Sequence, residues 1–180
     1  MTEQHSPEPG AAPRSDPTPT SPEPVHPEQG PTPHSPGIEM APGLEPHPML
    51  AGDAASAWMG LRVEDYAPGR AVCSLIPRPE MLNGFGIGHG GMTFALADTA
   101  FAIACNDASD HETYTVAQGV DINFLAPVTP GARLRATAER ASRPGRSAVF
   151  DVTVEQESEG GPVVVALFRG RSRTLPRAGR

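Results

Sequence analysis

The sequence predicts an α+β domain in which one long buried helix lies across one face of an antiparallel sheet. From His89 to Asn106 the chain is an alanine-rich, almost wholly apolar run whose one carboxylate is Asp98, which favours a buried helix. Four later segments alternate apolar and polar residues and are joined by short turns, as antiparallel strands are. A single helix cannot cover both faces of such a sheet, so we expect it on one face.

A short amphipathic helix and a hairpin are expected before the long helix. Residues 49–59 carry apolar side chains at helical spacing, and Pro48 just before them suits a helix start. Residues 61–66 and 71–76 have the pattern of strands joined by a turn at 67–70. Two prolines then end the hairpin, and a glycine-dense loop over residues 83–91 leads into the long helix.

Four strands are expected after the long helix and its polar connector. They cover residues 113–126, 133–138, 150–155 and 163–172, with turns at 127–131, 142–145 and 159–162. Because the connections are short, the four strands are expected to form an antiparallel meander. The domain is expected to span residues 49–174, and residues 175–180 to be a frayed basic end.

The first 48 residues differ from the rest in composition. They contain 14 of the 22 prolines and no Phe, Trp or Tyr, so they cannot bury enough apolar surface to offset the entropy of ordering. We expect a disordered, Pro-rich, acidic tail. It lacks the basic start and apolar core of a secretory signal, so the protein is expected in the cytoplasm, with no membrane segment.

Charge and residue types exclude several classes of function. The tail has seven acids and one Arg, whereas residues 49–180 have 14 acids and 13 Arg and are therefore close to neutral, which argues against nucleic-acid binding. The chain has no Lys, which excludes Schiff-base chemistry and a P-loop lysine. Cys73 and Cys105 are interpreted as small reduced core residues, although a distant His could still activate Cys105. The spacing of His89, Asp98 and Cys105 matches no compact zinc pattern, so no metal site is expected.

The glycine loop and Asp98 are the candidate site. A helix that opens with Gly90 and Gly91 presents bare N–H groups at its positive end, which suits developing negative charge on a carbonyl. Asp98 has no Lys or Arg within the helix. Either a distant Arg or the helix of a second subunit satisfies it, or it is a catalytic acid, base or nucleophile. Asp98 lies two turns beyond the glycines, so one chain alone would not bring both to the same carbonyl.

The combined motifs resemble the hotdog-fold thioesterases, in particular the PaaI-like, phenylacetic-acid-degradation group of acyl-CoA thioesterases. The matching stretches are Asn83-x-x-Gly86-x-x-His89-Gly90-Gly91, Leu96-Ala97-Asp98-Thr99-Ala100-Phe101-Ala102, Cys105-Asn106, Asp121-Ile122-Asn123-Phe124-Leu125-x-Pro127 and Ala166-Leu167-Phe168-Arg169-Gly170. The resemblance covers residues 49–174 and implies a hotdog fold, in which the sheet wraps around the central helix.

The resemblance also implies roles for individual residues. Asp98 would activate water or attack the thioester directly, and the Gly90 N–H would polarise the thioester carbonyl. Asn83 would hold the loop or the attacking water, and His89 would support the pair. Each site would take Asp98 from one subunit and the loop 83–90 from the other. The family usually forms homotetramers, as dimers of dimers, and needs no metal or bound cofactor.

The resemblance implies an acyl-CoA thioesterase that prefers aryl-acetyl chains. Candidate substrate-binding residues are Gly91, Phe85, Met92, Phe94, Arg143 and Arg146, the two arginines as partners for CoA phosphates or as solvated surface charge. One alternative is a hotdog hydratase or dehydratase acting on acyl-CoA or acyl-carrier-protein substrates. Another is a hotdog protein that binds acyl-CoA without catalysis.

Overall fold

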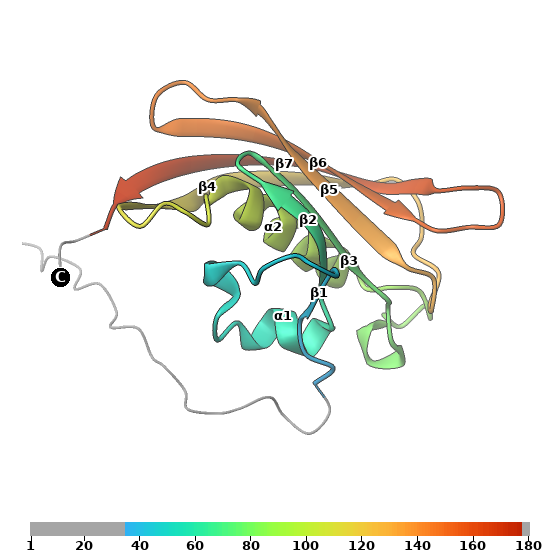
Figure 1. Cartoon of the computed structure of the whole chain (residues 1–180). Helices are drawn as coiled ribbons and strands as arrows, with labels where there is room; N and C mark the ends of the chain where they lie inside the picture. The colour runs from blue at the N-terminus through green and yellow to red at the C-terminus, as the bar shows by residue number, and fades with distance from the viewer. Residues whose placement is uncertain (1–34, 178–180) are drawn as a thin grey trace, which may run out of the picture.

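The fold is a seven-stranded sheet that curves over one face of a long central helix (Figure 1). A computed structural model describes residues 35–177. In chain order the elements are β1 (Glu39–Met40), η1 (Pro48–Leu50), α1 (Ala54–Met59), β2 (Arg62–Ala67), β3 (Arg70–Leu75), η2 (Pro79–Met81), α2 (Gly90–Cys105), β4 (Thr113–Phe124), β5 (Leu134–Ser142), β6 (Ser147–Gln156) and β7 (Val163–Pro176). The predicted α+β class, with the long helix on one face of the sheet, is confirmed.

The central helix α2 is fixed at both ends and along one face. The His89 side chain caps its first turn, and Asn106 closes it by donating Nδ2–H to the carbonyls of Ala102 (3.0 Å) and Thr115 (3.1 Å). Its buried residues are Thr93, Leu96, Ala97, Ala100, Phe101, Ile103 and Ala104. Contrary to the expectation of a helix buried all round, the stripe containing Ala95, Asp98 and Ala102 stays partly exposed. That stripe, which is apolar except for Asp98, is only partly covered by the rest of residues 35–177.

The strand order is β1-β2-β3-β5-β6-β7-β4. The predicted β2–β3 hairpin is present, and β5, β6 and β7 form the expected antiparallel meander. The prediction was wrong for β4, which pairs with β7 at the edge of the sheet instead of with β5. The reason is that the segment between β4 and β5 carries the chain across the sheet, and a short turn signal does not specify the neighbour of a strand. Strand β4 is therefore an edge strand of 12 residues.

The segment before α1 is more ordered than its composition predicts. Residues 35–48 belong to the predicted tail, but β1 pairs in parallel with β2, so the domain begins before residue 49. Residues 1–34 lie outside the described residues. The predicted helix over 49–59 is two short helices, because Gly52 has a φ of 77° and Asp53 starts α1 by accepting from the Ser56 N–H at 3.0 Å. At the other end, β7 continues to Pro176, where a frayed end was expected.

His47 attaches this early segment to the end of α2. Its side chain is 2% exposed, Nε2 lies 3.0 Å from the Asn106 carbonyl oxygen, and Nδ1 accepts from the Met49 N–H. Burial lowers the pKa of the imidazole, against the raising effects of the Asn106 carbonyl and the Asp107 carboxylate. His47 is therefore a structural histidine whose two ring nitrogens hold residues 35–50 against the domain.

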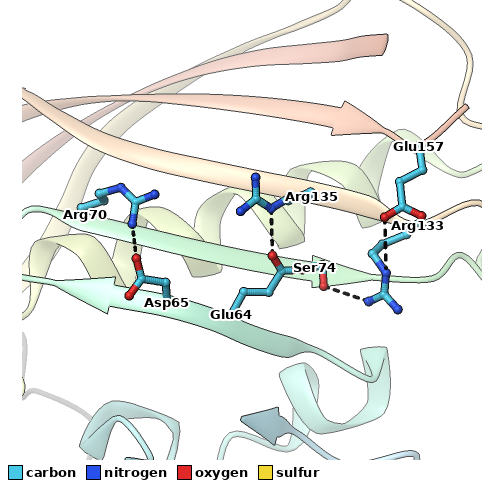
Figure 2. A network of polar contacts seen from close by, with 7 residues as sticks. All are labelled: Glu64, Asp65, Arg70, Ser74, Arg133, Arg135 and Glu157. Carbon is cyan, nitrogen blue, oxygen red and sulfur yellow. Dashed lines mark hydrogen bonds and ion pairs between the residues drawn. The ribbon is translucent and has the colours of Figure 1, made fainter. Parts of the chain in front are cut away.

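A polar network covers β2, β3 and β5 on the face that alternates with their core residues (Figure 2). Arg135 Nε donates to Glu64 Oε2 at 2.8 Å, and Arg133 donates to Ser74 Oγ at 3.1 Å while its Nε lies 3.8 Å from Glu157. Burial acts to raise the pKa of the Glu64 carboxyl, but the bonds from Arg135 and Ser74 outweigh it and the pKa is lowered. These charges satisfy one another, so this face has a structural role.

Candidate active site

A groove of about 370 Å³ lies at the N-terminal end of α2. It is formed where the glycine loop meets the end of β4 and the segment that follows it. Its wall includes Asn83, Ile87, Gly88, Gly90, Phe124 and Val128. The Gly88 N–H donates to the Val128 carbonyl at 2.9 Å, which fixes the loop against the segment after β4.

His89 and Gly91 form the cap of α2. The Gly91 N–H donates to His89 Nδ1 at 2.9 Å, so the imidazole hydrogen is assigned to Nε2. A Cβ at position 91 would lie 2.9 Å from that nitrogen, which explains why a glycine stands there. His89 therefore has a structural role as the cap of α2, and the supporting catalytic role that the resemblance implies stays a prediction. The Gly91 N–H is used by the cap and does not face a ligand.

The Gly90 N–H is the amide that this cap leaves free. The neighbouring amides of Gly88, Gly91 and Met92 all have acceptors, whereas the Gly90 N–H has none among residues 35–177 and borders the groove. The ring of Phe124 stands over Gly90, and a Cβ at position 90 would lie 3.2 Å from Phe124 Cζ. A free amide at the positive end of a 16-residue helix is suited to bind a carbonyl oxygen that gains negative charge.

Asn83 shapes the loop from its first residue. Its Oδ1 accepts from the Phe85 N–H at 2.9 Å, and its carbonyl accepts from the Gly86 N–H at 2.9 Å. Gly86 has a φ of 74°, a conformation that favours glycine. The Asn83 Nδ2 has no hydrogen-bond acceptor within the described part of the chain, and Asn83 lines the groove. The amide can therefore hold the loop and donate to a ligand or water at once.

Asp98 has the environment of a functional carboxylate. It is half-buried, and no hydrogen bond or ion pair to it occurs within residues 35–177. Burial raises the pKa of its carboxyl, which makes the carboxylate a stronger base than one in water.

The single chain does not bring Asp98 to Gly90. The two residues are eight positions apart on α2, which corresponds to about 12 Å along the helix axis, and Asp98 does not line the groove. Gly90 and Asn83 meet at the groove, whereas Asp98 lies on the partly exposed stripe of α2. A second copy of the chain could place its own carboxylate at the groove.

The remaining sequence-predicted substrate residues lie in different places. Phe85 is 90% exposed at the tip of the loop, and Met92 is partly buried against the core. Phe94 packs edge-on against Phe168 with ring centroids 5.7 Å apart, and neither Met92 nor Phe94 lines the groove. Arg143 lines a second cavity at the other end of α2, and Arg146 lines neither hollow.

Sequence reasoning missed Phe124 and Val128 as groove residues. The alternation in β4 places Phe124 on the same face as Ile122, which pairs with the core residue Phe168. That alternation could have indicated a contact with α2. It could not show that β4 ends beside Gly90, because this depends on β4 lying at the sheet edge.

Neither cysteine is suited to act as a nucleophile. Burial raises the pKa of both the Cys73 and the Cys105 thiols to about 12, so the reactive thiolate is scarce near neutral pH. The described residues contain no group of three or more His, Cys, Asp or Glu placed to hold a metal ion. They also contain no helix that is both long and apolar enough to cross a membrane.

Comparisons with known proteins point to one family. A model of the thioesterase superfamily matches residues 85–163. The acyl-coenzyme A thioesterase PaaI of Escherichia coli K12 is 36% identical over 129 residues, which cover 72% of this chain and 88% of the relative. A putative esterase of Deinococcus radiodurans is 31% identical and covers 74% of this chain and 86% of the relative.

Solved structures give the same result for the fold. The E. coli PaaI protein from the phenylacetic acid degradation operon superposes with a TM-score of 0.65 at 36% identity, over 72% of this chain and 89% of that chain. A mutant of the phenylacetic acid degradation protein PaaI from Thermus thermophilus gives a TM-score of 0.59 at 34% identity, over 66% and 96%. The expected hotdog fold is confirmed.

Proposed function

Because the chain belongs to the thioesterase superfamily and is a thioester hydrolase, we propose that it hydrolyses acyl-CoA thioesters to the free acid and CoA. The observation that carries this proposal is the free Gly90 N–H at the head of α2, beside a groove that can hold an acyl group. A thioester carbonyl placed there would accept a hydrogen bond that strengthens as its oxygen gains charge. Removing one such donor typically costs about 10²- to 10³-fold in kcat.

Asp98 supplies the attacking group in this proposal. Its carboxylate either takes a proton from water or adds to the carbonyl carbon itself, and its raised pKa suits the first role. When water attacks, its proton passes to Asp98 and the C–S bond breaks. The CoA thiolate then takes up a proton, and the products are a carboxylic acid and a thiol.

A homodimer completes the site. Asp98 and Gly90 of one chain are about 12 Å apart on the helix, and β4 leaves its outer edge unpaired. Tyr114 and Val116 on this strand are 39% and 40% exposed, and an exposed apolar edge strand invites pairing with another chain. Two copies that join their β4 edges would also bring the partly exposed stripes of α2 together. Each groove would then receive Asp98 from the partner subunit.

The acyl group in this proposal is phenylacetyl or a hydroxylated phenylacetyl. The groove is small and mostly apolar, and the ring of Phe124 at its edge suits an aromatic partner. The E. coli relative comes from a phenylacetic acid degradation operon, which supports the same substrate class. A homotetramer located in the cytoplasm, working without metal or bound cofactor, remains part of the proposal.

The test is thiol release by the purified protein and by Asp98→Asn. Substrates are phenylacetyl-CoA, a straight-chain acyl-CoA and benzoyl-CoA. The wild type should release thiol fastest from phenylacetyl-CoA, and Asp98→Asn should lower kcat by about 100-fold or more without loss of folding. Asp151→Asn, which removes an exposed carboxylate from the outer sheet face, is the matched control and should keep its rate.

Three results would contradict the proposal. Wild type that releases no thiol from any of the three esters would exclude a thioesterase for these substrates. A change at the acyl double bond of an enoyl-CoA without thiol release would indicate a hydratase. Full activity in Asp98→Asn would show that Asp98 is structural.

A further inference from the structure

Hydrogen bonds at both ends hold the segment that carries the chain from β4 to β5, at the same end of the molecule as η2 (Figure 1). This segment covers residues 125–133 and is called the crossing segment. At its start the Leu125 N–H donates to a carbonyl of β7 at 2.8 Å, and near its end the Gly131 N–H donates to a carbonyl just before η2 at 3.1 Å. Pro127 and Pro130 lie between these bonds and have no N–H. The middle of the crossing segment therefore has few backbone donors with which to join the sheet.

Gln156, the last residue of β6, binds this middle part with its side chain. Its Oε1 accepts from the Thr129 N–H at 3.0 Å, and its Nε2 donates to the Thr129 carbonyl at 2.7 Å. Because an N–H must donate and a carbonyl must accept, only this orientation of the amide fits. The side chain thus pairs with both backbone groups of one residue, as a neighbouring strand would.

Packing alone does not explain a glutamine at this position. Gln156 is 5% exposed and continues the buried face of β6. The other buried residues of that strand are all apolar: Ala148, Phe150, Val152 and Val154. A buried amide is costly unless its polar atoms are paired, and the partner that pairs both of them is Thr129. The residue type at 156 is therefore matched to the crossing segment.

A short series of contacts connects Gln156 with the glycine loop. Thr129 follows Val128, which lines the groove and whose carbonyl accepts from the Gly88 N–H at 2.9 Å. Gly90, whose N–H is free, comes two residues after Gly88. Each step from Gln156 to Gly90 is thus a hydrogen bond or one or two residues of backbone. Gln156 itself does not line the groove.

From these contacts we propose that Gln156 is a positioning residue, which fixes the Val128 carbonyl and through it the place of the Gly90 N–H, without touching the substrate. This inference rests on the proposed function. A donor that stabilises developing charge is effective because it is held in place before the reaction. A displacement of about 1 Å at such a group can cost about 100-fold in rate. The amide of Gln156 prevents that displacement by holding the wall against which the glycine loop rests.

The test replaces Gln156 by methionine, which has a similar length and no amide. In Gln156→Met the Gly88 N–H, followed by NMR, should exchange with solvent at least about tenfold faster than in the wild type, because its acceptor is no longer held in place. For phenylacetyl-CoA, kcat should fall at least about tenfold and KM should change by less than about twofold, since the acyl group still binds while the donor to the reacting oxygen is misplaced. Gln156→Leu, which has a different shape, should give the same changes, so the result does not depend on one replacement.

Two further variants separate positioning from general stability. Gly88→Ala moves the loop away from Val128 directly, since a Cβ at position 88 would lie 2.5 Å from Val128 Cγ1. Adding Gln156→Met to Gly88→Ala should therefore lower kcat by less than about twofold more, whereas independent effects would multiply. His47→Leu is the matched control. It also removes a buried side chain with two bonds to the backbone, but at the C-terminal end of α2, and it should keep the wild-type kcat and Gly88 exchange rate.

Amide exchange distinguishes failure of this inference from failure of the proposed function. Unchanged Gly88 exchange or unchanged kcat in Gln156→Met of an active enzyme would overturn the positioning role and leave the thioesterase proposal intact. Full multiplication of the two losses in the double variant would also overturn it, because Gln156 would then act by another route. A loss of kcat in His47→Leu equal to that in Gln156→Met would overturn it as well, since it indicates general destabilisation. Faster Gly88 exchange in a protein that hydrolyses no thioester would support the link from Gln156 to the loop and contradict only the proposed function.

Discussion

Replacing Gly88 by alanine should move the glycine loop and lower activity more than stability. Gly88 is buried and donates its N–H to the Val128 carbonyl at 2.9 Å. A Cβ at position 88 would lie 2.5 Å from Val128 Cγ1 and 2.8 Å from Val128 Cβ. Val128 is 5% exposed and cannot swing into solvent. The loop must therefore retreat from the segment after β4, and Gly90 follows Gly88 by only two residues.

The size of the effect follows from these distances. Carbon atoms in contact prefer about 3.5–4.0 Å, so the two chains must separate by about 1 Å. Overpacking of this kind costs roughly 1–3 kcal/mol of unfolding free energy. A displacement of about 1 Å at a positioned group can cost about 100-fold in rate. We therefore expect Gly88→Ala to lower kcat about 100-fold while the protein stays folded.

The assay is thiol release together with urea unfolding. Gly84→Ala is the matched control, because a Cβ at position 84 meets nothing within 4 Å, and it should leave both measurements unchanged. Adding Val128→Ala to Gly88→Ala removes the nearer atom and should recover part of kcat. Val128→Ala alone removes about 1.6 kcal/mol of apolar burial at about 0.8 kcal/mol per methyl. Wild-type kcat in Gly88→Ala, or no recovery in the double variant, would refute the coupling between this contact and the Gly90 amide.

Three further predictions concern the rest of the domain. Burial lowers the pKa of His47 in the folded protein, so below about pH 6.5 the unfolded chain binds more protons than the folded one. The free energy of unfolding should therefore fall as the pH drops below about 6.5. The urea midpoint of His47→Gln should fall less over the same pH range than that of the wild type. A wild type whose midpoint changes no more than that of His47→Gln would contradict this. A Cβ at Gly170 would lie 2.6 Å from the Phe101 ring, so Gly170→Ala should lower the free energy of unfolding in urea by roughly 1–3 kcal/mol. Adding Phe101→Leu to Gly170→Ala should recover part of that loss. The control Gly160→Ala should leave the free energy of unfolding unchanged. If the effects of Gly170→Ala and Phe101→Leu on the free energy of unfolding simply added, the contact between the two residues would be refuted. Because the pKa of the Cys105 thiol is raised to about 12, Cys105 should react with iodoacetamide at about pH 8 at least tenfold more slowly in the native protein than in urea. Mass spectrometry follows the reaction. Equal rates in the two states would show that the thiolate is accessible in the native protein.

The sequence predicted the elements whose signals are local. Helix α2 was predicted from its alanines and apolar run, and the β2–β3 hairpin from alternation interrupted by a turn. Asp98 stood out because an acid within an apolar helix needs a reason, and its raised pKa agrees with that reasoning. Whether it takes part in catalysis stays a prediction.

The features that the sequence could not supply depend on tertiary pairing. Strand β4 has the alternation of any half-buried strand, and nothing local says that it skips β5 and pairs with β7. The two residues of β1 are too short for periodicity and are ordered by β2.

The central claim is that each site combines Asp98 of one subunit with Asn83 and Gly90 of the other, and mixing two inactive variants tests it most directly. Asp98→Asn and Asn83→Ala should each be nearly inactive. When they are unfolded together in equal amounts and refolded, half of the dimers should be mixed and each mixed dimer should contain one intact site, which gives about a quarter of the wild-type activity. If mixed dimers form and no activity returns, Asp98 and Asn83 act within one chain and the shared site is wrong.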